Sequence, residues 1–366
     1  MDYVRLGGSD LLVSRVTMGT MTFGRQNTLE EGVAQLNLAF DEYGVNCIDT
    51  AEMYPVPTEA GTQGLTDLAV AQFLKTRARE EVILCTKVSG RSDRITWLRG
   101  GNATTCVSAA QIRESVDASL ARLGTGYVDL LQLHWPDRYT GTMFGSPDYD
   151  PSAAKAAPPP VPFEEQLAAL QELVEAGKVR HVGLSNETPY GLMRFSQLAE
   201  QFPRLYPRIV ACQNSYSLLV RKDWEAGCAE VCDKVGVGLL AYSPLGGGVL
   251  SAKYSAKPSP DTRPSRFQLF PGFQDRYLGS QCEAAVTEYK DIASRHGMSA
   301  TTLALAWAYH NPKVASSIIG ATTLEQLEED LKAYDTRLSS DVMDEIADVY
   351  RRYQDPTKAY KKPKAP

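Results

Sequence analysis

Residues 82–135 contain the pattern that decides the fold: VILCTK (82–87), then SAAQIRESVDASLARLG (108–124), then YVDLLQLHW (127–135). The first and last runs are rich in aliphatic and β-branched residues, which is typical of strands buried on both faces. The middle run repeats apolar residues at helical spacing, and Gly124 follows its last apolar position, where a helix-ending glycine stands. A strand, a helix and a second strand in this order predict a parallel βαβ unit.

The same alternation extends along the chain in both directions. Eight runs have the composition of strands, at residues 16–20, 46–49, 82–87, 127–135, 179–185, 209–214, 236–243 and 315–320. Helical patterns lie between or after them, for example at residues 29–44, 108–124, 163–177, 301–310 and 323–334. Eight such units without a break fit a closed (β/α)8 TIM barrel, an α/β fold, better than an open sheet. We therefore expect one barrel domain spanning residues 1–366.

The N-terminal segment, the C-terminal segment and three long loops lie outside the eight strand–helix units. Residues 1–15 place two apolar runs around a Gly-Ser-Asp turn, which predicts a β-hairpin closing the barrel bottom. Residues 339–353 begin with a serine cap and continue as an amphipathic helix, and 354–366 form a tail. Long loops follow three strands, at residues 89–106, 136–162 and 251–280. Because the C-terminal face of a barrel carries the active site, we expect these loops to cover that site.

The composition argues against several classes of protein. Of 366 residues, 43% are hydrophobic and 22% charged, with a net charge of −6, which is typical of a folded chain rather than a disordered one. Basic residues cluster only in the tail, so neither a nucleic-acid partner nor a protein partner is predicted. The chain has no apolar run of about 18 residues and no signal pattern, so no membrane association is expected. We expect a cytoplasmic protein, or one in an organelle such as a plastid if a targeting peptide has been removed.

The seven cysteines show neither CxxC nor Cys/His spacing, so neither a disulfide scaffold nor a metal site is predicted. Free thiols are the expectation. Cys228 and Cys232 share one helix face, which leaves a redox pair open as an alternative.

Four polar side chains stand at or just after the ends of consecutive predicted strands: Asp49, Tyr54, Lys87 and His134. The strands of a barrel end at one rim, so these groups should meet. Asp49 would pair with Lys87, and Lys87 would lower the pKa of Tyr54 below its ordinary value of about 10. Tyr54 would then donate a proton to a carbonyl oxygen that His134 orients and polarises. This arrangement predicts a carbonyl-reducing enzyme.

A hydride for such a reduction must come from a cofactor, and the later strands should hold it. Ser185, Asn186 and Gln213 end two of these strands and offer a hydroxyl and amides suited to a carboxamide. Tyr242 ends the next strand, where it could stack on a flat ring. The following glycines, Gly246 to Gly248, allow close backbone approach to a phosphate, although neither GxGxxG nor Walker spacing is present.

The spaced motifs DTAEMY (49–54), TK (86–87), LHWP (133–136), GLSN (183–186), AYSPLGGG (241–248) and IIGATTLEQLEED (318–330) resemble the aldo-keto reductase superfamily. The resemblance runs from the first strand to the last helix. Within the superfamily the chain is most similar to the Tas-like branch, through GTMTFG (19–24), AEMYPVP (51–57) and SNETPYG (185–191).

This resemblance implies a (β/α)8 reductase that uses NADPH/NADP+ to reduce small carbonyl substrates, with Asp49, Tyr54, Lys87 and His134 as its catalytic tetrad. It also implies that Tyr242 stacks on the nicotinamide and that residues 320–330 hold the adenosine end. The cofactor-binding residues expected from it are Thr20, Met21, Ser185, Asn186, Gln213, Tyr242, Ser243, Pro244, Leu245, Gly247, Lys253, Arg263, Arg266, Gly320, Thr322, Gln326, Glu329 and Asp330. The expected substrate-pocket residues are Phe23, Trp97 and Trp135, and Phe144 is a further candidate wall.

One departure from the family concerns the nucleotide. Many members carry basic residues in the last loop to grip the 2′-phosphate, whereas residues 320–330 contain neither Lys nor Arg. Hydroxyls and backbone amides could bind this phosphate instead, or Arg263 or Arg266 could fold over it. NADPH is the expected cofactor, and NADH remains an alternative.

Two other functions stay open at this point. Lys87 could form a Schiff base in an aldolase, since desolvated lysines on barrels do so, but Asp49 would keep it charged. A cofactor-occupied barrel could also serve as a regulatory subunit with little turnover.

Overall fold

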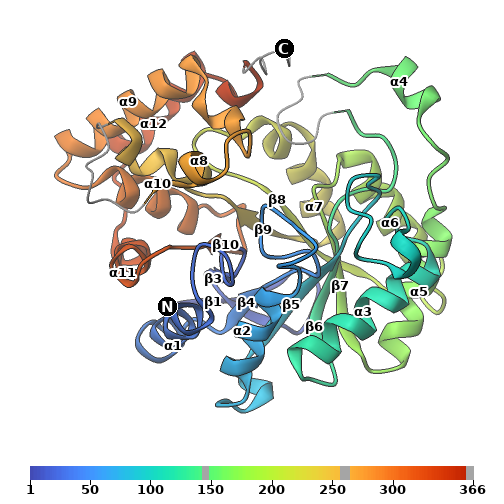
Figure 1. Ribbon diagram of the computed structural model, residues 1–366. Coiled ribbons are helices and arrows are strands. Elements are labelled where there is room, and N and C mark those ends of the chain that lie inside the picture. The colour runs from blue at the N-terminus through green and yellow to red at the C-terminus, as the bar shows by residue number, and fades with distance from the viewer. Residues whose placement is uncertain (142–147, 256–263, 360–366) are drawn as a thin grey trace.

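The computed structural model describes residues 1–141, 148–255 and 264–359, and it confirms the predicted (β/α)8 barrel (Figure 1). Eight parallel strands close on themselves in the order β10-β3-β4-β5-β6-β7-β8-β9. Their bounds are β3 Val16–Gly19, β4 Cys47–Asp49, β5 Ile83–Val88, β6 Val128–Leu133, β7 Val179–Ser185, β8 Ile209–Ser215, β9 Gly238–Tyr242 and β10 Ser316–Ile319. Every predicted strand run therefore overlaps a strand of the barrel, and β5 and β8 extend one residue beyond their runs.

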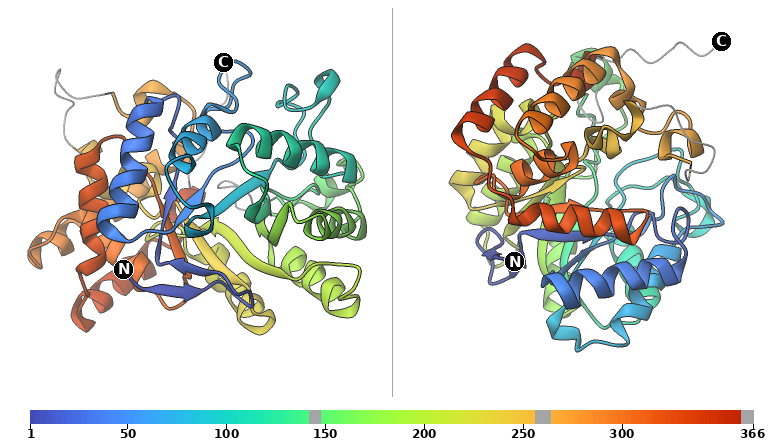
Figure 2. Two further views of the ribbon diagram at one scale, coloured as in Figure 1. Left: turned by 90° about the horizontal axis from the view of Figure 1, so that it is seen from below. Right: turned by 90° about the vertical axis from the view of Figure 1, so that its left-hand side faces the viewer.

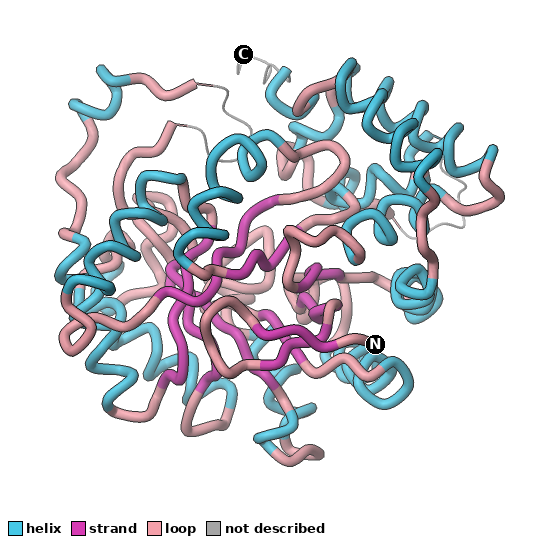
Figure 3. Tube along the Cα trace, turned by 180° about the vertical axis from the view of Figure 1, so that it is seen from behind, coloured by secondary structure: helices cyan, strands magenta, loops and turns pink. Residues whose placement is uncertain are grey.

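Helices surround these strands on the outside (Figures 2 and 3). Those of the barrel units are α1 Leu29–Tyr43, α2 Leu65–Leu74, α3 Ala109–Leu123, α5 Phe163–Glu175, α6 Pro189–Gln201, α7 Ala229–Val235, α10 Ala300–Tyr309 and α11 Leu324–Lys332. The remaining ones are α4 Pro151–Ala156, α8 Arg266–Leu269, α9 Ser280–Arg295 and α12 Ser340–Arg352. The helices α1 and α11, far apart in sequence, lie side by side where β3 meets β10.

Local sequence determines where several helices begin and end. Thr28 and Glu31 form a capping box at the start of α1, in which each side chain accepts a hydrogen bond from the other's backbone N–H. The helix stops at Gly44, whose φ of 67° places it in the left-handed region that glycine adopts without strain. Gly124 ends α3 in the same way, with φ at 64°. The predicted helix end at Gly124 is confirmed, and Gly44 ends the helical pattern at residues 29–44 in the same way.

An antiparallel hairpin of β1 (Tyr3–Arg5) and β2 (Leu12–Ser14) closes one end of the barrel. Its Leu6 and Val13 pack with Cys47 and Cys85 in a buried cluster. These cysteines stand two residues before Asp49 and Lys87 on β4 and β5, so the hairpin covers the end opposite the strand C-termini, as predicted. All seven cysteines are free thiols.

The three predicted long loops follow β5, β6 and β9 at the C-terminal rim. In the first loop, Ser92 and Thr105 form an isolated antiparallel bridge that joins its two ends. The second loop contains α4. The third contains α8 and a short helix at Asp275–Leu278. Among the residues that the structure describes, no helix is long and apolar enough to cross a membrane.

Candidate active site

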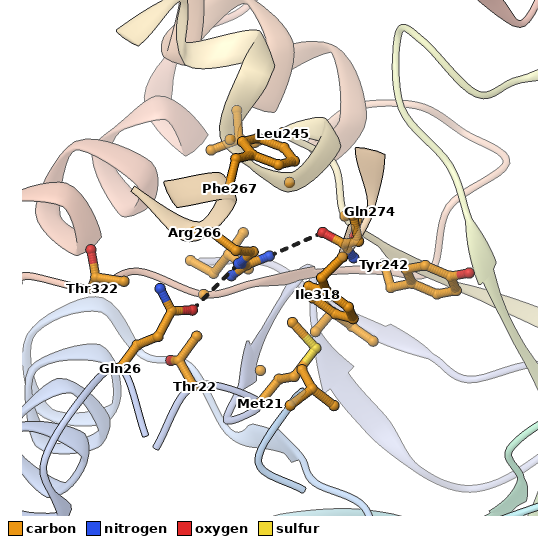
Figure 4. Close-up of a pocket in the computed structure, with 18 of the residues that line it drawn as sticks. Met21, Thr22, Gln26, Tyr242, Leu245, Arg266, Phe267, Gln274, Ile318 and Thr322 are labelled. Carbon is orange, nitrogen blue, oxygen red and sulfur yellow. Dashed lines mark hydrogen bonds between the residues drawn. The ribbon is translucent and has the colours of Figure 1, made fainter. Parts of the chain in front are cut away.

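A cavity of about 1660 Å³ opens at the C-terminal ends of the strands. It exceeds the roughly 300–1,000 Å³ of most small-molecule sites, so it has room for an extended ligand beside a small one. Figure 4 shows part of its wall, where Met21 and Thr22 lie after β3 and Arg266, Phe267 and Gln274 come from the loop after β9. The cavity thus lies between the barrel rim and the third long loop.

Asp49, Lys87 and Tyr54 meet at the deep end of this cavity. Lys87 is fully buried, and its Nζ donates to Asp49 Oδ2 at 2.6 Å. The same ammonium donates to the Thr50 carbonyl at 2.8 Å and to Tyr54 Oη at 3.3 Å. Asp49 and Lys87 reach each other because they lie at or next to the ends of the adjacent strands β4 and β5. Tyr54 lies in the turn that follows β4. The predicted convergence of these three side chains is therefore present.

Two opposing effects set the pKa of Tyr54. Burial raises it, and the positive charge of Lys87 lowers it less strongly, so the pKa of Tyr54 lies above its ordinary value. The prediction that Lys87 brings this pKa below 10 is thus wrong for the protein as described, because the pattern of residues does not reveal the extent of desolvation. Burial also lowers the pKa of Lys87, but Asp49 and Tyr54 more than compensate and raise it above its ordinary value. Tyr54 is a protonated phenol beside a charged ammonium.

His134 follows β6 and faces Tyr54 edge-on, with ring centroids 5.9 Å apart. Burial, and then the charge of Lys87, hold its pKa well below the ordinary value, so the imidazole is neutral. Its Nδ1 is buried without a hydrogen-bond partner among the described residues. A buried imidazole nitrogen without a partner is an available polar group at the position predicted to bind a carbonyl oxygen.

The predicted carboxamide-binding residues form one connected group. Asn186 donates from Nδ2 to the His134 carbonyl at 2.8 Å, and its Oδ1 accepts from Tyr242 Oη at 2.6 Å. Gln213 donates from Nε2 to Asp49 Oδ1 at 2.8 Å, and Ser185 Oγ donates to the Gln213 carbonyl at 2.8 Å. These bonds hold the amides and Tyr242 in fixed orientations next to Tyr54 and His134.

A backbone bend and two cationic side chains line the rest of the cavity. Gly247 has a φ of 68°, and a methyl group added there would come within 2.9 Å of the Gln274 side-chain oxygen. Arg266 bridges Gln26 and Gln274 at 3.4 and 3.3 Å, as Figure 4 shows. Burial, followed by the nearby charge of Arg266, lowers the pKa of Lys253. Neither cation forms an ion pair within the described parts of the chain.

Every predicted cofactor residue within the described ranges lines this cavity, which leaves out only Arg263. Asp330 lines the cavity from α11, and its burial raises the pKa of its carboxyl group from the ordinary 3.8 to about 8. Asp49, Tyr54 and His134 also line the cavity, and Lys87 lies just behind them.

The substrate-pocket predictions need correction. Trp135 lines the cavity, but neither Phe23 nor Trp97 is among its described lining residues. Phe23 is fully buried in the core, where a Cβ added at Gly32 would strike its ring at 2.8 Å. It is therefore a packing residue between α1 and the barrel. Phe144 lies outside the described residues. The apolar walls near Tyr54 are instead Met53, Val56 and Phe273.

A buried carboxylate that the sequence reasoning did not single out lies within the DTAEMY motif. Glu52 accepts from both terminal nitrogens of Arg99, at 2.7 and 2.9 Å. It also accepts from the Ser89 backbone N–H at 2.5 Å and from Ser115 Oγ at 2.6 Å. Glu52 therefore fastens the first long loop to the turn that carries Tyr54. The sequence signal that could have identified Glu52 is its position between two predicted site residues, Asp49 and Tyr54.

The cavity fits a nicotinamide dinucleotide. Tyr242 offers a flat ring beside the oriented amides, and the bend at Gly247 leaves room for close approach of a diphosphate. Lys253 and Arg266 line the cavity further along and offer positive charge that forms no ion pair within the described residues. The residues present would thus hold both ends of such a group.

The barrel and this site define an NAD(P)H-dependent oxidoreductase. Residues 15–351 match the model of the aldo/keto reductase family, and the chain belongs to that family.

Three relatives illustrate how far the similarity extends. "Protein tas" of Escherichia coli (strain K12) is 45% identical over 359 residues, covering 97% of this chain and 99% of the relative. An "Aldo-keto reductase" of Babesia bovis is 40% identical over 285 residues, covering 75% of this chain and 98% of its own. The "Uncharacterized oxidoreductase YrpG" of Bacillus subtilis (strain 168) is 29% identical over 356 residues, covering 96% of each. The expected resemblance to the superfamily and its Tas-like branch is confirmed.

Proposed function

We propose that this enzyme uses NADPH to reduce small aldehydes or ketones to alcohols, with Tyr54 as the proton donor. The observation that supports this most strongly is the hydrogen bonding of Lys87 Nζ to both Asp49 and Tyr54 at the deep end of the cavity. A protonated phenol next to a fixed positive charge is suited to proton donation, because the charge stabilises the phenolate that forms.

Each residue has a separate task in the proposed reaction. The reduced nicotinamide supplies a hydride to the carbonyl carbon when bound. Tyr54 Oη gives its proton to the carbonyl oxygen, whose π electron pair becomes the new O–H bond. Lys87 stabilises the resulting phenolate, and Asp49 keeps Lys87 charged and in place. His134, neutral at this position, orients the oxygen through a ring N–H. The product is the alcohol, and water then returns a proton to Tyr54.

The charge distribution favours NADPH over NADH. The charge of Arg266 lowers the pKa of Lys253 more strongly than Asp330 raises it, and no carboxylate forms an ion pair with either cation among the described residues. A 2′-phosphate between them would relieve this repulsion, whereas the ribose hydroxyl of NADH would not. Replacing Arg266 with alanine should raise the Kd for NADPH about 10- to 100-fold and change that for NADH little. An unchanged ratio of the two dissociation constants would reject this role.

The ion pair of Lys87 opposes the aldolase alternative. Schiff-base formation needs a neutral amine, and Asp49, together with Tyr54, raises the pKa of Lys87. The regulatory alternative makes a different kinetic prediction, namely bound cofactor that exchanges slowly and supports little turnover.

The first test is binding and turnover by the wild-type protein. NADPH binding is measured by quenching of tryptophan fluorescence, and NADPH oxidation is then followed at 340 nm against aldehydes, ketones and dicarbonyls. Saturable oxidation that produces one alcohol per NADPH supports the proposal. Tight binding without turnover supports the regulatory alternative, and no binding of either nucleotide rejects both.

A further inference from the structure

The cavity wall holds two further cations that neither the catalytic cluster nor the cofactor residues account for. Arg276 lies on the short helix Asp275–Leu278 of the third long loop, and Arg94 lies in the first long loop. Both line the cavity, and within the described residues neither guanidinium forms an ion pair. Arg276 is only partly exposed, so water solvates its charge incompletely.

Contacts place Arg276 on the side of the cavity where Tyr242 lies. Its guanidinium stacks 4.6 Å from the centre of the Tyr277 ring and donates to Tyr277 Oη at 3.2 Å. That hydroxyl lies 3.5 Å from Ser215 Oγ, and Ser215 is paired in register with Tyr242 on the neighbouring strand. These partners hold the guanidinium in position, and none of them is a carboxylate, so the described residues give its charge no ion pair.

Tyr242 connects this cation to the reacting end of the cavity. The positive charge of Arg276 lowers the pKa of Tyr242, opposing the stronger effect of burial, and the Tyr54 phenol acts on the same hydroxyl. Tyr242 Oη donates to Asn186, which in turn donates to the carbonyl of His134. Arg276 and the proposed proton donor thus both act on Tyr242 and line the same cavity.

The wall near Tyr54 is apolar, because it is built from Met53, Val56 and Phe273. A ligand fitting this region would present a carbonyl group to Tyr54, an apolar middle to these side chains and a negative group to Arg276. A guanidinium binds carboxylates and phosphates through two parallel hydrogen bonds, which a neutral group cannot replace.

We propose that the preferred substrates are aldehydes or ketones that carry a carboxylate, bound by Arg276 on the cavity wall. This inference rests on the proposed function and names the substrate class for the same site. The carboxylate takes no part in the chemistry and leaves unchanged on the alcohol.

The test compares pairs of compounds that differ in charge at one end. These are 4-carboxybenzaldehyde with methyl 4-formylbenzoate, and succinic semialdehyde with methyl 4-oxobutanoate. The wild type should favour the acid in kcat/KM for at least one pair. In Arg276→Gln the ratio of acid to ester should fall about 10- to 100-fold, as loss of a charged hydrogen bond predicts. The matched control Asp275→Asn, next to it on the same cavity wall, should keep or increase this ratio.

Several results would overturn the assignment. One is a wild-type enzyme with no preference for either acid, and another is an Arg276→Gln variant with an unchanged ratio. A ratio that falls only in Arg94→Gln would place the anion site on the other loop. If Arg276→Gln weakens NADPH binding and lowers kcat/KM equally for the acid and for the ester, Arg276 belongs to the cofactor site.

Failure of the proposed function gives a different pattern. If no carbonyl compound turns over, binding of 4-(hydroxymethyl)benzoate and of its methyl ester to the NADP+-bound protein still tests Arg276. Tighter binding of the acid that Arg276→Gln abolishes supports the anion site even without turnover, and equal binding of both compounds overturns it. Thermal melting of each variant identifies any that fails to fold.

Discussion

Replacing Lys87 with methionine perturbs the centre of the proposed site. Lys87 is 0% exposed, and its Nζ lies 2.6 Å from Asp49 Oδ2. Methionine keeps the apolar stem, and among the described residues it leaves the Asp49 carboxylate with two amide donors, Gln213 at 2.8 Å and Gln132 at 3.5 Å. Breaking a buried ion pair on one side costs about 3–5 kcal/mol. Because the Gln213 amide remains, we expect the free energy of unfolding to fall by about 3 kcal/mol.

A double-mutant cycle separates this effect from lost packing. Asp49→Asn, added to Lys87→Met, removes the uncompensated charge and should recover about 1–2 kcal/mol relative to Lys87→Met alone. The assay is urea unfolding of the wild type, both single variants and the double variant. It is followed by fluorescence and by far-ultraviolet circular dichroism, whose transitions must coincide. If the stability lost in the double variant equals the sum of the losses in the two single variants within about 0.5 kcal/mol, a strong coupling between Asp49 and Lys87 is refuted.

Two further predictions concern buried carboxylates. Glu52→Gln leaves Arg99 buried without its ion partner and should lower the free energy of unfolding, measured in urea, by about 3 kcal/mol. The control is Asp41→Asn, which removes an exposed ion partner of Arg77 and should lower the free energy of unfolding by less than about 1 kcal/mol. Equal effects of the two changes would reject the anchoring role of Glu52. The pKa of Asp330 rises from 3.8 to about 8 on folding, so the folded protein binds the extra proton and loses stability as pH rises through this range. Asp330→Asn should therefore match the wild type near pH 4 and exceed it by up to roughly 5 kcal/mol at pH 8, at about 1.4 kcal/mol per pKa unit. Parallel stability curves from pH 4 to 8 would contradict this.

The fold was predictable because the barrel strands are short, apolar and regularly spaced. The positions of Asp49, Lys87 and His134 followed from this spacing, since strand ends define one rim. Gly44 and Gly124 marked helix ends because each needs a positive φ that other residues adopt only with strain.

The rest of the site depends on contacts that no local pattern specifies. Phe23 and Trp97 follow strands as pocket residues do, but Phe23 is buried in the core and Trp97 is not among the described residues that line the cavity. The pairing of Glu52 with Arg99 joins residues 47 positions apart. The direction of the Tyr54 pKa shift depends on how much desolvation outweighs the charge of Lys87, and only the packed structure provides this balance.

Single-turnover reduction by a Tyr54→Phe variant tests the central claim most directly. Phenylalanine keeps the ring but removes the proposed proton, while Lys87, His134 and the cavity remain. Enzyme loaded with NADPH is mixed with the best carbonyl substrate, and the decay of absorbance at 340 nm is compared with that of the wild type. We predict an NADPH Kd unchanged within about threefold and a rate lower by about 100- to 10,000-fold, the usual contribution of a general acid. A rate within a few-fold of the wild type would contradict the assignment of Tyr54 as the proton donor.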